Sequence, residues 1–442
     1  MQVSVTTTQG LERRMTVEIP AERIESEIQA RLKSMVRTAR VAGFRPGKTP
    51  LKVIERKYGP QVRDDVVSDV VQSSFSEAVV QESLRPAGTP KIGEVKIEPG
   101  KPLAYTATFE VYPTINSVSL EGITISRPTA DITEQDVDEM LEKMRRQRAT
   151  WAAVDRTAAD ADRVTIDFVG NMSGEPFAGN TAENYQLVLG SGAMIPGFED
   201  RLTGAAAGDA LTLDLTFPAD YHVVALAGQP VQFKVTVRTV EAARLPEIDE
   251  EFAKTFGVAD GNVDTMREEM KKSMAHEQRD AIKTAVRAQV MDALAKANAV
   301  EVPQALVDQE TNEILARFFG RMGIDPARAA KLNIPRETVE VRARRTVGLR
   351  LILAETMRQN NIKVTPEALR AAVESFAQSY DNPEEVVKWY YADRKRLADM
   401  EAVTLEQQLV DWILARVTVN DQPTTFAGLI KRRQSILNEQ AS

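Results

Sequence analysis

A short loop near the N-terminus reads Gly43-Phe44-Arg45-Pro46-Gly47-Lys48-Thr49-Pro50 and separates two stretches with helical periodicity. It lies within residues 31–57, where nine cations face a single anion, so the local charge is +8 in a chain of net charge −8. Such an asymmetry predicts contact with a polyanion. The prolines and glycines stiffen and tighten the turn. Phe44 offers an apolar anchor, while Arg45 and Lys48 can pair with phosphate or carboxylate.

Two other interpretations of the loop stay open. Residues 42–49 nearly match the phosphate-binding pattern GxxxxGK[ST], but Ala42 replaces the first glycine. The preceding residues 35–41 also have the pattern of a basic helix, whereas a P-loop follows a buried strand. A plain solvated turn between two helices would fit the composition as well. Docking accounts for the aromatic ring and the cations together, and we prefer it.

The composition predicts a multidomain globular protein. A chain of 442 residues suggests two to four domains, and 43% apolar with 27% charged residues is typical of globular proteins. No window of 18 uncharged apolar residues occurs, so we expect no membrane span and no membrane partner. The N-terminus has neither a basic n-region nor an apolar h-region, so we expect a cytoplasmic protein.

Residue usage also limits the chemistry. The chain has no cysteine, which excludes disulfides, thiolate metal sites and a cysteine nucleophile. Only two histidines occur, His222 and His276, so we expect neither a histidine-based triad nor a metal centre. No cofactor is expected. His222 follows Tyr221, and contact of His222 with a substrate stays open.

The first third of the chain alternates extended and helical patterns. We expect a hairpin around Gly10, a helix from Pro20 and a second helix after Pro60. Further strands are expected at Lys91–Ile97 and Leu103–Val111, then a polar connector at Ser126–Asp131. Thr133 and Asp136 resemble a capping box, which starts an otherwise exposed helix that ends near Arg148.

The middle and the end of the chain differ in pattern. Four alternating segments separated by Gly, Asn and Pro turns predict a compact β-rich domain with a short helix at Pro196–Leu202: Val164–Phe168, Tyr185–Leu189, Leu211–Leu215 and Val231–Val237. From Pro246 to about residue 417 the chain is expected to be almost wholly helical: Phe252–Phe256, Val263–Ala297, Pro303–Met322, Thr338–Gln359, Pro366–Ser379 and Arg394–Val417. The methionines of this part fit either packing or exposed apolar patches. The carboxylate pairs, such as Glu268-Glu269, are expected on solvated faces.

The docking loop resembles the ribosome-docking signature of the bacterial trigger factor family, and the order of parts is similar over the whole chain. The resemblance implies docking on the large ribosomal subunit, at ribosomal protein and rRNA near the exit tunnel, with unfolded nascent polypeptides as clients and no nucleotide. A homodimer of the free protein stays open. The resemblance assigns ribosome contact to Gly43, Phe44, Arg45, Pro46, Gly47 and Lys48.

The middle region resembles the FKBP-type peptidyl-prolyl isomerases, through Val164–Gly170 and, more specifically, through Leu189–Glu199. Phe198 stands where many relatives have tryptophan, and Ala178 where small members have aspartate, which bears on macrolide-inhibitor binding more than on isomerase activity. On periodicity alone the aromatic residues would be ordinary core. The resemblance implies an apolar proline pocket lined by Phe168, Phe177, Tyr185, Met194, Ile195, Phe198, Tyr221 and Phe233.

These observations predict a multidomain α+β protein with an N-terminal α+β ribosome-docking domain, an FKBP-like β-rich middle domain and an extended all-α C-terminal region. The expected limits are 1–112 for the docking domain, 113–149 for a connector with one long helix, 150–243 for the isomerase domain and 244–442 for a helical substrate-holding domain. The leading hypothesis is an ATP-independent ribosome-associated chaperone that also isomerises X–Pro bonds.

The alternative is a freestanding FKBP-type prolyl isomerase that acts on folded partners, and binding of proline-free unfolded chains would distinguish the two. A periplasmic chaperone would need a signal sequence. A nucleic-acid-binding protein fits poorly with a net charge of −8, because the positive charge is confined to one loop region.

Overall fold

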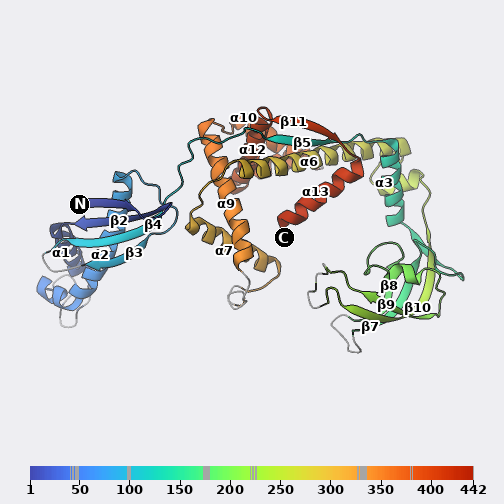
Figure 1. The fold of residues 1–442 in the computed structure, drawn as a ribbon, viewed down its shortest axis with the longest axis horizontal. Coiled ribbons are helices and arrows are strands. Elements are labelled where there is room, and N and C mark those ends of the chain that lie inside the picture. The colour runs from blue at the N-terminus through green and yellow to red at the C-terminus, as the bar shows by residue number, and fades with distance from the viewer. Residues whose placement is uncertain are drawn as a thin grey trace. The chain divides into compact units, whose positions relative to one another are not determined.

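The computed structural model describes residues 1–39, 41, 44, 49–96, 101–172, 180–219, 221, 223, 226–325, 328, 336–378, 380 and 382–441 (Figure 1). The chain divides into two compact units: Met1–Arg127 with Ala285–Gln422, and Pro128–Thr284 with Pro423–Ser442. No described helix is long and apolar enough to cross a lipid bilayer.

The first unit begins with an antiparallel sheet in the order β1-β2-β4-β3. The strands are β1 (Gln2–Thr7), β2 (Glu12–Ile19), β3 (Lys91–Lys96) and β4 (Leu103–Glu110). The predicted hairpin is confirmed: Gly10 has a φ of 52°, and the Glu12 N–H donates to the Gln9 carbonyl at 2.8 Å. Every second residue of β4 is buried, as expected for a strand with one face on a core.

Two helices, α1 (Ala21–Thr38) and α2 (Leu51–Gln81), cover one face of this sheet (Figure 1). The hydroxyls of Ser74 on α2 and Tyr105 on β4 lie 3.0 Å apart in the buried interface. The rings of Phe75 and Phe109 meet edge to face with centroids 5.2 Å apart. The loop that decides the docking hypothesis therefore joins two helices that are anchored on one core.

The expectation that the second helix follows Pro60 was wrong. Helix α2 begins at Leu51 and continues through Pro60. A proline inside a helix removes one hydrogen bond and costs about 3 kcal/mol. Ile54 and Val62, on either side of the proline, are both buried in the core, so packing of the whole helix outweighs that cost.

Helical hairpins form the rest of the first unit. The helices α7 (Gln304–Arg321) and α9 (Arg336–Gln359) pack together, and so do α10 (Pro366–Ala377), α11 (Pro383–Tyr391) and α12 (Arg394–Leu414). Between α7 and α9, the buried carboxylate of Glu310 accepts hydrogen bonds from Arg317 at 3.2 Å and Arg350 at 2.8 Å.

The polar connector expected at Ser126–Asp131 overlaps a strand instead. Strand β5 (Thr124–Thr129) pairs with β11 (Thr418–Pro423), from the far end of the chain. Arg127 donates to both carboxylate oxygens of Asp421, at 2.7 and 3.0 Å. The polar sequence hid this strand because its partner lies almost 300 residues away.

The second unit contains α3 (Glu134–Gln147), α5 (Glu250–Thr255), α13 (Phe426–Ala441) and much of α6 (Val263–Ala297). The capping box is confirmed, with Asp136 accepting the Thr133 N–H at 2.8 Å. The expectation of an exposed helix was wrong for the apolar stripe of α3: Val137 and Leu141 are buried in one core with α5, α6 and α13. Met266, Met270 and Met274 belong to the same core, so these methionines are packing residues.

The β-rich part of the second unit is a five-stranded antiparallel sheet. Strand β10 (Pro230–Arg244) pairs along one edge with β7 (Arg163–Asn171), which in turn pairs with β8 (Thr181–Val188). Its other edge holds β9 (Ala210–Thr216) and β6 (Thr150–Ala153), the one strand here that the sequence pattern did not indicate. Helix α4 (Phe198–Leu202) packs on this sheet.

A buried carboxylate fixes the turn that leads into β7. Asp162 accepts the Ala159 N–H at 2.8 Å and an Arg156 guanidinium N–H at 2.9 Å. Its side chain is only 6% exposed. The hydrogen bonds from Arg156 hold the pKa of the Asp162 carboxyl below its usual value.

We expect Asp162→Asn to lower the free energy of unfolding of this domain by about 1–3 kcal/mol at pH 7, because a charged hydrogen-bonding partner is lost. The folded-state pKa is depressed, so the wild-type contribution is present above the unfolded-state pKa of about 3.9 and is lost as the pH falls through the lower folded-state value. The difference between the two proteins should therefore narrow in acid. Urea unfolding followed by Trp151 fluorescence, with Trp389 and Trp412 replaced by Phe, checks this. A difference in unfolding free energy that stays constant as the pH is lowered contradicts it.

Candidate functional site

An apolar cavity of about 490 Å³ opens on the β-rich part of the second unit. Six of the residues expected in the proline pocket line it. Four more lining residues were missed. Among the described residues, the lining is Phe168, Tyr185, Ala193, Met194, Ile195, Pro196, Phe217, Pro218, Tyr221 and Phe233.

Aromatic rings meet edge to face around Phe168. Its centroid lies 6.0 Å from that of Tyr185, 6.0 Å from that of Phe198 and 5.8 Å from that of Phe233, with interplanar angles of 75–82°. Phe198 and Phe233 make a further edge contact at 5.4 Å. Such contacts fix ring orientations more tightly than area burial alone. Tyr185 remains 37% exposed and forms part of the rim.

The placement of Phe198 corrects the sequence expectation. Its side chain is fully buried in the core and is absent from the cavity lining. Its ring contacts Phe168 and Phe233 from below, so Phe198 supports the floor without forming it. The predicted pocket residue Phe177 and the histidine His222 lie outside the described residues.

The missed residues come from two loops whose roles depend on tertiary structure. Phe217 packs its ring on Tyr221 with centroids 4.7 Å apart, and Pro218 follows it directly. Ala193 and Pro196 flank two residues that the sequence did indicate. Proximity of Phe217 and Pro218 to Tyr221 in the sequence was the one signal that would have found them.

The loop between β8 and α4 shapes one wall of the cavity. Gly197, the residue before α4, has a φ of 83°, and a Cβ there would lie 3.3 Å from a Leu215 methyl. Gly190 has the same φ, and a Cβ there would clash with the Asp160 carboxylate at 2.3 Å. Glycine is therefore required at both ends of the loop.

The chemistry of the cavity follows from its lining. None of the described residues that line it carries a charge, and the hydroxyls of Tyr185 and Tyr221 are its polar side-chain groups. Within the part of the chain that the structure describes, no three His, Cys, Asp or Glu side chains gather in a group that could hold a metal ion. The described lining thus offers a mainly apolar enclosure.

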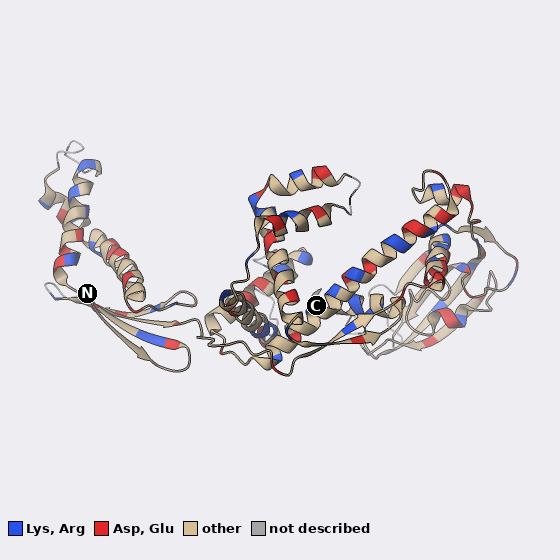
Figure 2. Cartoon of the chain, turned by 90° about the horizontal axis from the view of Figure 1, so that it is seen from above, with Lys and Arg blue, Asp and Glu red and all other residues tan. Residues whose placement is uncertain are grey.

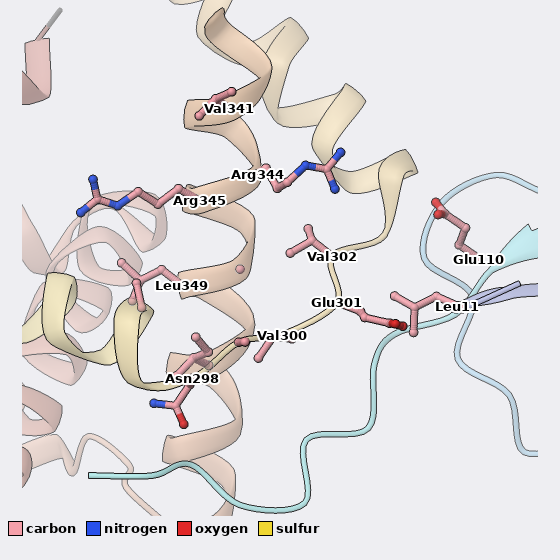
Figure 3. A pocket seen from close by; sticks show the side chains of 15 residues that line it. Leu11, Glu110, Asn298, Val300, Glu301, Val302, Val341, Arg344, Arg345 and Leu349 are labelled. Carbon is pink, nitrogen blue, oxygen red and sulfur yellow. The ribbon is translucent and has the colours of Figure 1, made fainter. Parts of the chain in front are cut away.

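A larger cavity of about 620 Å³ lies in the first unit, beside the turn between α6 and α7 (Figure 3). Arg344 and Arg345 point to opposite sides of α9 and pair with Glu340 and Asp292, respectively. Glu110 accepts the first N–H groups of α7, from Gln304 at 2.9 Å and Ala305 at 2.7 Å. These charges are thus used in structural contacts.

The structure describes three residues of the docking loop: Phe44, Thr49 and Pro50. The Phe44 ring is 42% exposed and stands outside the buried core of its domain. Gly43, Arg45, Pro46, Gly47 and Lys48 lie outside the described residues. The flanking helices carry exposed cations: Arg31, Lys33 and Arg37 on α1, and Lys52, Arg56 and Lys57 on α2. Figure 2 colours the Lys and Arg positions of the chain blue.

Helix α10, helix α11 and Tyr380 between them carry a cluster of rings that we call the aromatic patch: Phe376, Tyr380, Trp389 and Tyr390. The ring centroid of Phe376 lies 5.4 Å from that of Tyr380 and 5.6 Å from that of Tyr390. The ring centroids of Trp389 and Tyr390 lie 5.3 Å apart. Phe376, Tyr380 and Trp389 are 41%, 50% and 54% exposed. Phe376, Tyr380 and Trp389 thus form an apolar cluster that is open to solvent.

Comparison with known families agrees with this architecture. Residues 154–238 match the FKBP-type peptidyl-prolyl cis-trans isomerase family, so the protein is a multidomain protein with a prolyl isomerase domain. Residues 1–144 match the family described as bacterial trigger factor protein (TF), and residues 262–415 match its C-terminus.

Curated relatives cover nearly the whole chain. Trigger factor of Pseudomonas fluorescens is 43% identical over 433 residues, and that of Stutzerimonas stutzeri is 45% identical over 433 residues, each covering 98% of both chains. A solved structure described as "Promiscuous Substrate Recognition in Folding and Assembly Activities of the Trigger Factor Chaperone" matches 94% of this chain and 100% of that one, with a TM-score of 0.51 and 18% identity, and so supports the fold.

The chain belongs to the bacterial trigger factor family. It is a chaperone for nascent chains that docks on the ribosome, and it carries an FKBP-type peptidyl-prolyl cis-trans isomerase domain.

Proposed function

We propose that the aromatic cavity is the place where this chain isomerises X–Pro bonds. The observation that carries the proposal is a ring-walled cavity, uncharged in its described lining, in the region that matches the isomerase family. Phe168, Met194, Ile195 and Phe233 enclose the proline ring, and Tyr185 and Tyr221 form the rim. The family resemblance adds Phe177 to the proposed lining. Phe198 is proposed to support the floor of the cavity through its contacts with Phe168 and Phe233.

The reaction explains why an apolar cavity suffices. Amide resonance sets a rotation barrier of roughly 18–20 kcal/mol, and unaided X–Pro exchange takes roughly tens to hundreds of seconds. The twisted transition state has lost conjugation, so its carbonyl carries less separated charge than the planar amide. An apolar wall therefore disfavours the planar form relative to the twisted one, and no covalent bond needs to break.

Docking is proposed to use the loop tip. Phe44 would enter an apolar site, and Arg45, Pro46 and Lys48 would contact ribosomal protein and rRNA of the large subunit beside the exit tunnel. The 42% exposure of Phe44 supports this, because a phenylalanine that belonged to the domain core would be buried. The cations of α1 and α2 add a salt-sensitive, sequence-independent attraction to rRNA.

Holding of clients is proposed to use the aromatic patch. Rigid exposed rings bind varied apolar segments at a low entropic cost. The Arg396 guanidinium stacks 3.8 Å above the Trp389 ring and donates to the Trp389 carbonyl at 2.7 Å, which keeps that ring in place. Holding by such a surface requires no nucleotide.

The finer assignments follow from these roles. We propose 1–112 as the docking domain, 113–149 as connector, 150–243 as the isomerase domain and 244–442 as the holding domain. A ribosomal partner places the protein in the cytoplasm. We also propose that the free protein can form a homodimer, which sedimentation velocity measures.

Replacing Phe44, Arg45 and Pro46 together by Ala should abolish co-sedimentation with large ribosomal subunits, because the anchor and a cation are both removed. The measurement is pelleting at several salt concentrations. As a control, Lys91→Ala with Lys96→Ala removes two cations from strand β3 of the same domain and should leave pelleting nearly intact. Equal loss in both variants would assign the effect to charge alone and contradict docking by the loop.

Phe198→Leu and Tyr185→Ala should each lower kcat/KM for a Leu–Pro tetrapeptide, by about tenfold, equivalent to about 1.4 kcal/mol. The first loosens the floor under Phe168 and the second removes part of the rim. Leu is used at 198 because truncation of a buried Phe to Ala costs about 3–5 kcal/mol of stability. Holding of an unfolded client should persist in both; unchanged peptide turnover in both rejects the cavity.

Replacing Trp389 and Phe376 by Ser should weaken suppression of aggregation of a proline-free unfolded client, by several-fold, while peptide isomerisation stays unchanged. Val341→Ser on α9, where Val341 is 73% exposed, is the matched control for loss of exposed apolar surface. Light scattering of the refolding client provides the readout. Full protection by the double variant would favour a freestanding isomerase over holding by this patch.

A further inference from the structure

A second buried carboxylate lies directly beneath one wall of the cavity. Glu199, in the first turn of α4, is 8% exposed. Its Oε2 accepts the Gly192 N–H at 3.0 Å, and its Oε1 accepts the Met194 N–H at 3.1 Å and the Ser191 hydroxyl at 3.4 Å. Within the described residues, no Lys or Arg forms an ion pair with Glu199, so backbone N–H groups are its main partners.

The hydrogen-bonded N–H groups belong to the loop that builds the wall. Met194 and Ile195 line the cavity, and the Phe198 N–H donates to the Ile195 carbonyl at 3.1 Å. The loop contains glycines with positive φ, such as Gly192 at 70°, and such residues lose the most conformational freedom on ordering. One carboxylate thus ties the wall loop to the helix that starts with the floor-supporting Phe198.

We propose that Glu199 is a positioning residue for X–Pro isomerisation: it preforms the wall made by Met194 and Ile195 without touching the substrate. The proposal rests on the assignment of the cavity as the isomerase site. A carboxylate is required because it offers two acceptor oxygens and no donor, whereas an amide would turn an NH₂ group toward one of the two N–H donors. Charge-assisted hydrogen bonds of this kind are roughly twice as strong as neutral ones.

A preformed wall and a merely stable fold make different kinetic predictions. When the wall is ordered only part of the time, apparent substrate affinity falls by that fraction, while the bound complex regains the same geometry. Glu199→Gln should therefore raise KM for a Leu–Pro tetrapeptide about tenfold and change kcat by less than about twofold. A residue that only stabilises the fold would lower the amount of active protein and leave KM unchanged.

Asp162→Asn is the matched control. Asp162 is also a buried carboxylate that accepts a loop N–H in this domain, at 2.8 Å from Ala159. Among the described residues, the donors to its side chain are Ala159 and Arg156, and neither belongs to the wall loop. Both variants should lower the stability of the domain, and only Glu199→Gln should raise KM. In amide spectra of the full-length chain, the Gly192 and Met194 proton resonances should move upfield in Glu199→Gln and stay in place in Asp162→Asn.

Kinetics are measured by NMR exchange on the full-length variants at rising peptide concentration. An unchanged KM in Glu199→Gln, or an equal rise of KM in Asp162→Asn, overturns the proposal. If Glu199→Gln fails to fold, Glu199→Asp, which keeps the charge and both acceptors but is one methylene shorter, undergoes the same test with an intermediate rise. Phe198→Leu and Tyr185→Ala distinguish failure of the Glu199 proposal from failure of the cavity assignment: unchanged peptide turnover in both variants rejects the cavity itself, whatever Glu199 does.

Discussion

Strand β10 is the element on which the isomerase domain depends, because it is hydrogen-bonded along both edges. Phe168 of β7 lies opposite Val235 on one side, and Leu213 of β9 lies opposite Phe233 on the other. Side chains alternate between faces with a period of two, and the buried set of β10 includes Val231, Phe233 and Val235. A slip by one residue would turn Phe233 from the cavity to the solvent, so the paired edges fix the cavity together with the sheet.

That register allows one domain to combine a stable core with an open apolar site. Phe198 and Phe233 belong to the same buried cluster, yet Phe233 also faces the cavity. The edge-to-face contacts continue from the core through Phe168 to the rim at Tyr185. The site is thus the outer layer of the core, and it is rigid for the same reason that the core is stable. A rigid apolar enclosure of this kind is what the proposed rotation about an X–Pro bond requires.

Acidic side chains organise the backbone in several places where no chemistry is expected of them. Asp136 and Asp249 accept N–H groups at the starts of α3 and α5, and Glu110 does the same for α7. Asp162 and Glu199 play the corresponding part in loops of the isomerase domain. At these positions the carboxylates therefore serve the fold, whereas the local excess of cations lies in residues 31–57.

Local patterns in the sequence determined much of this protein: the alternation of the strands, the short helix at α4, the capping box at Thr133 and the composition of the docking loop. Six described cavity residues were also predicted, because the resemblance fixed their order along the chain. Tertiary structure alone decided that α2 continues through Pro60, that β5 finds its partner at β11, and that Phe198 lies under the floor while Phe217 joins the wall. The reason is physical: periodicity and capping act over a few residues, whereas burial and strand pairing depend on segments that meet only in the folded chain.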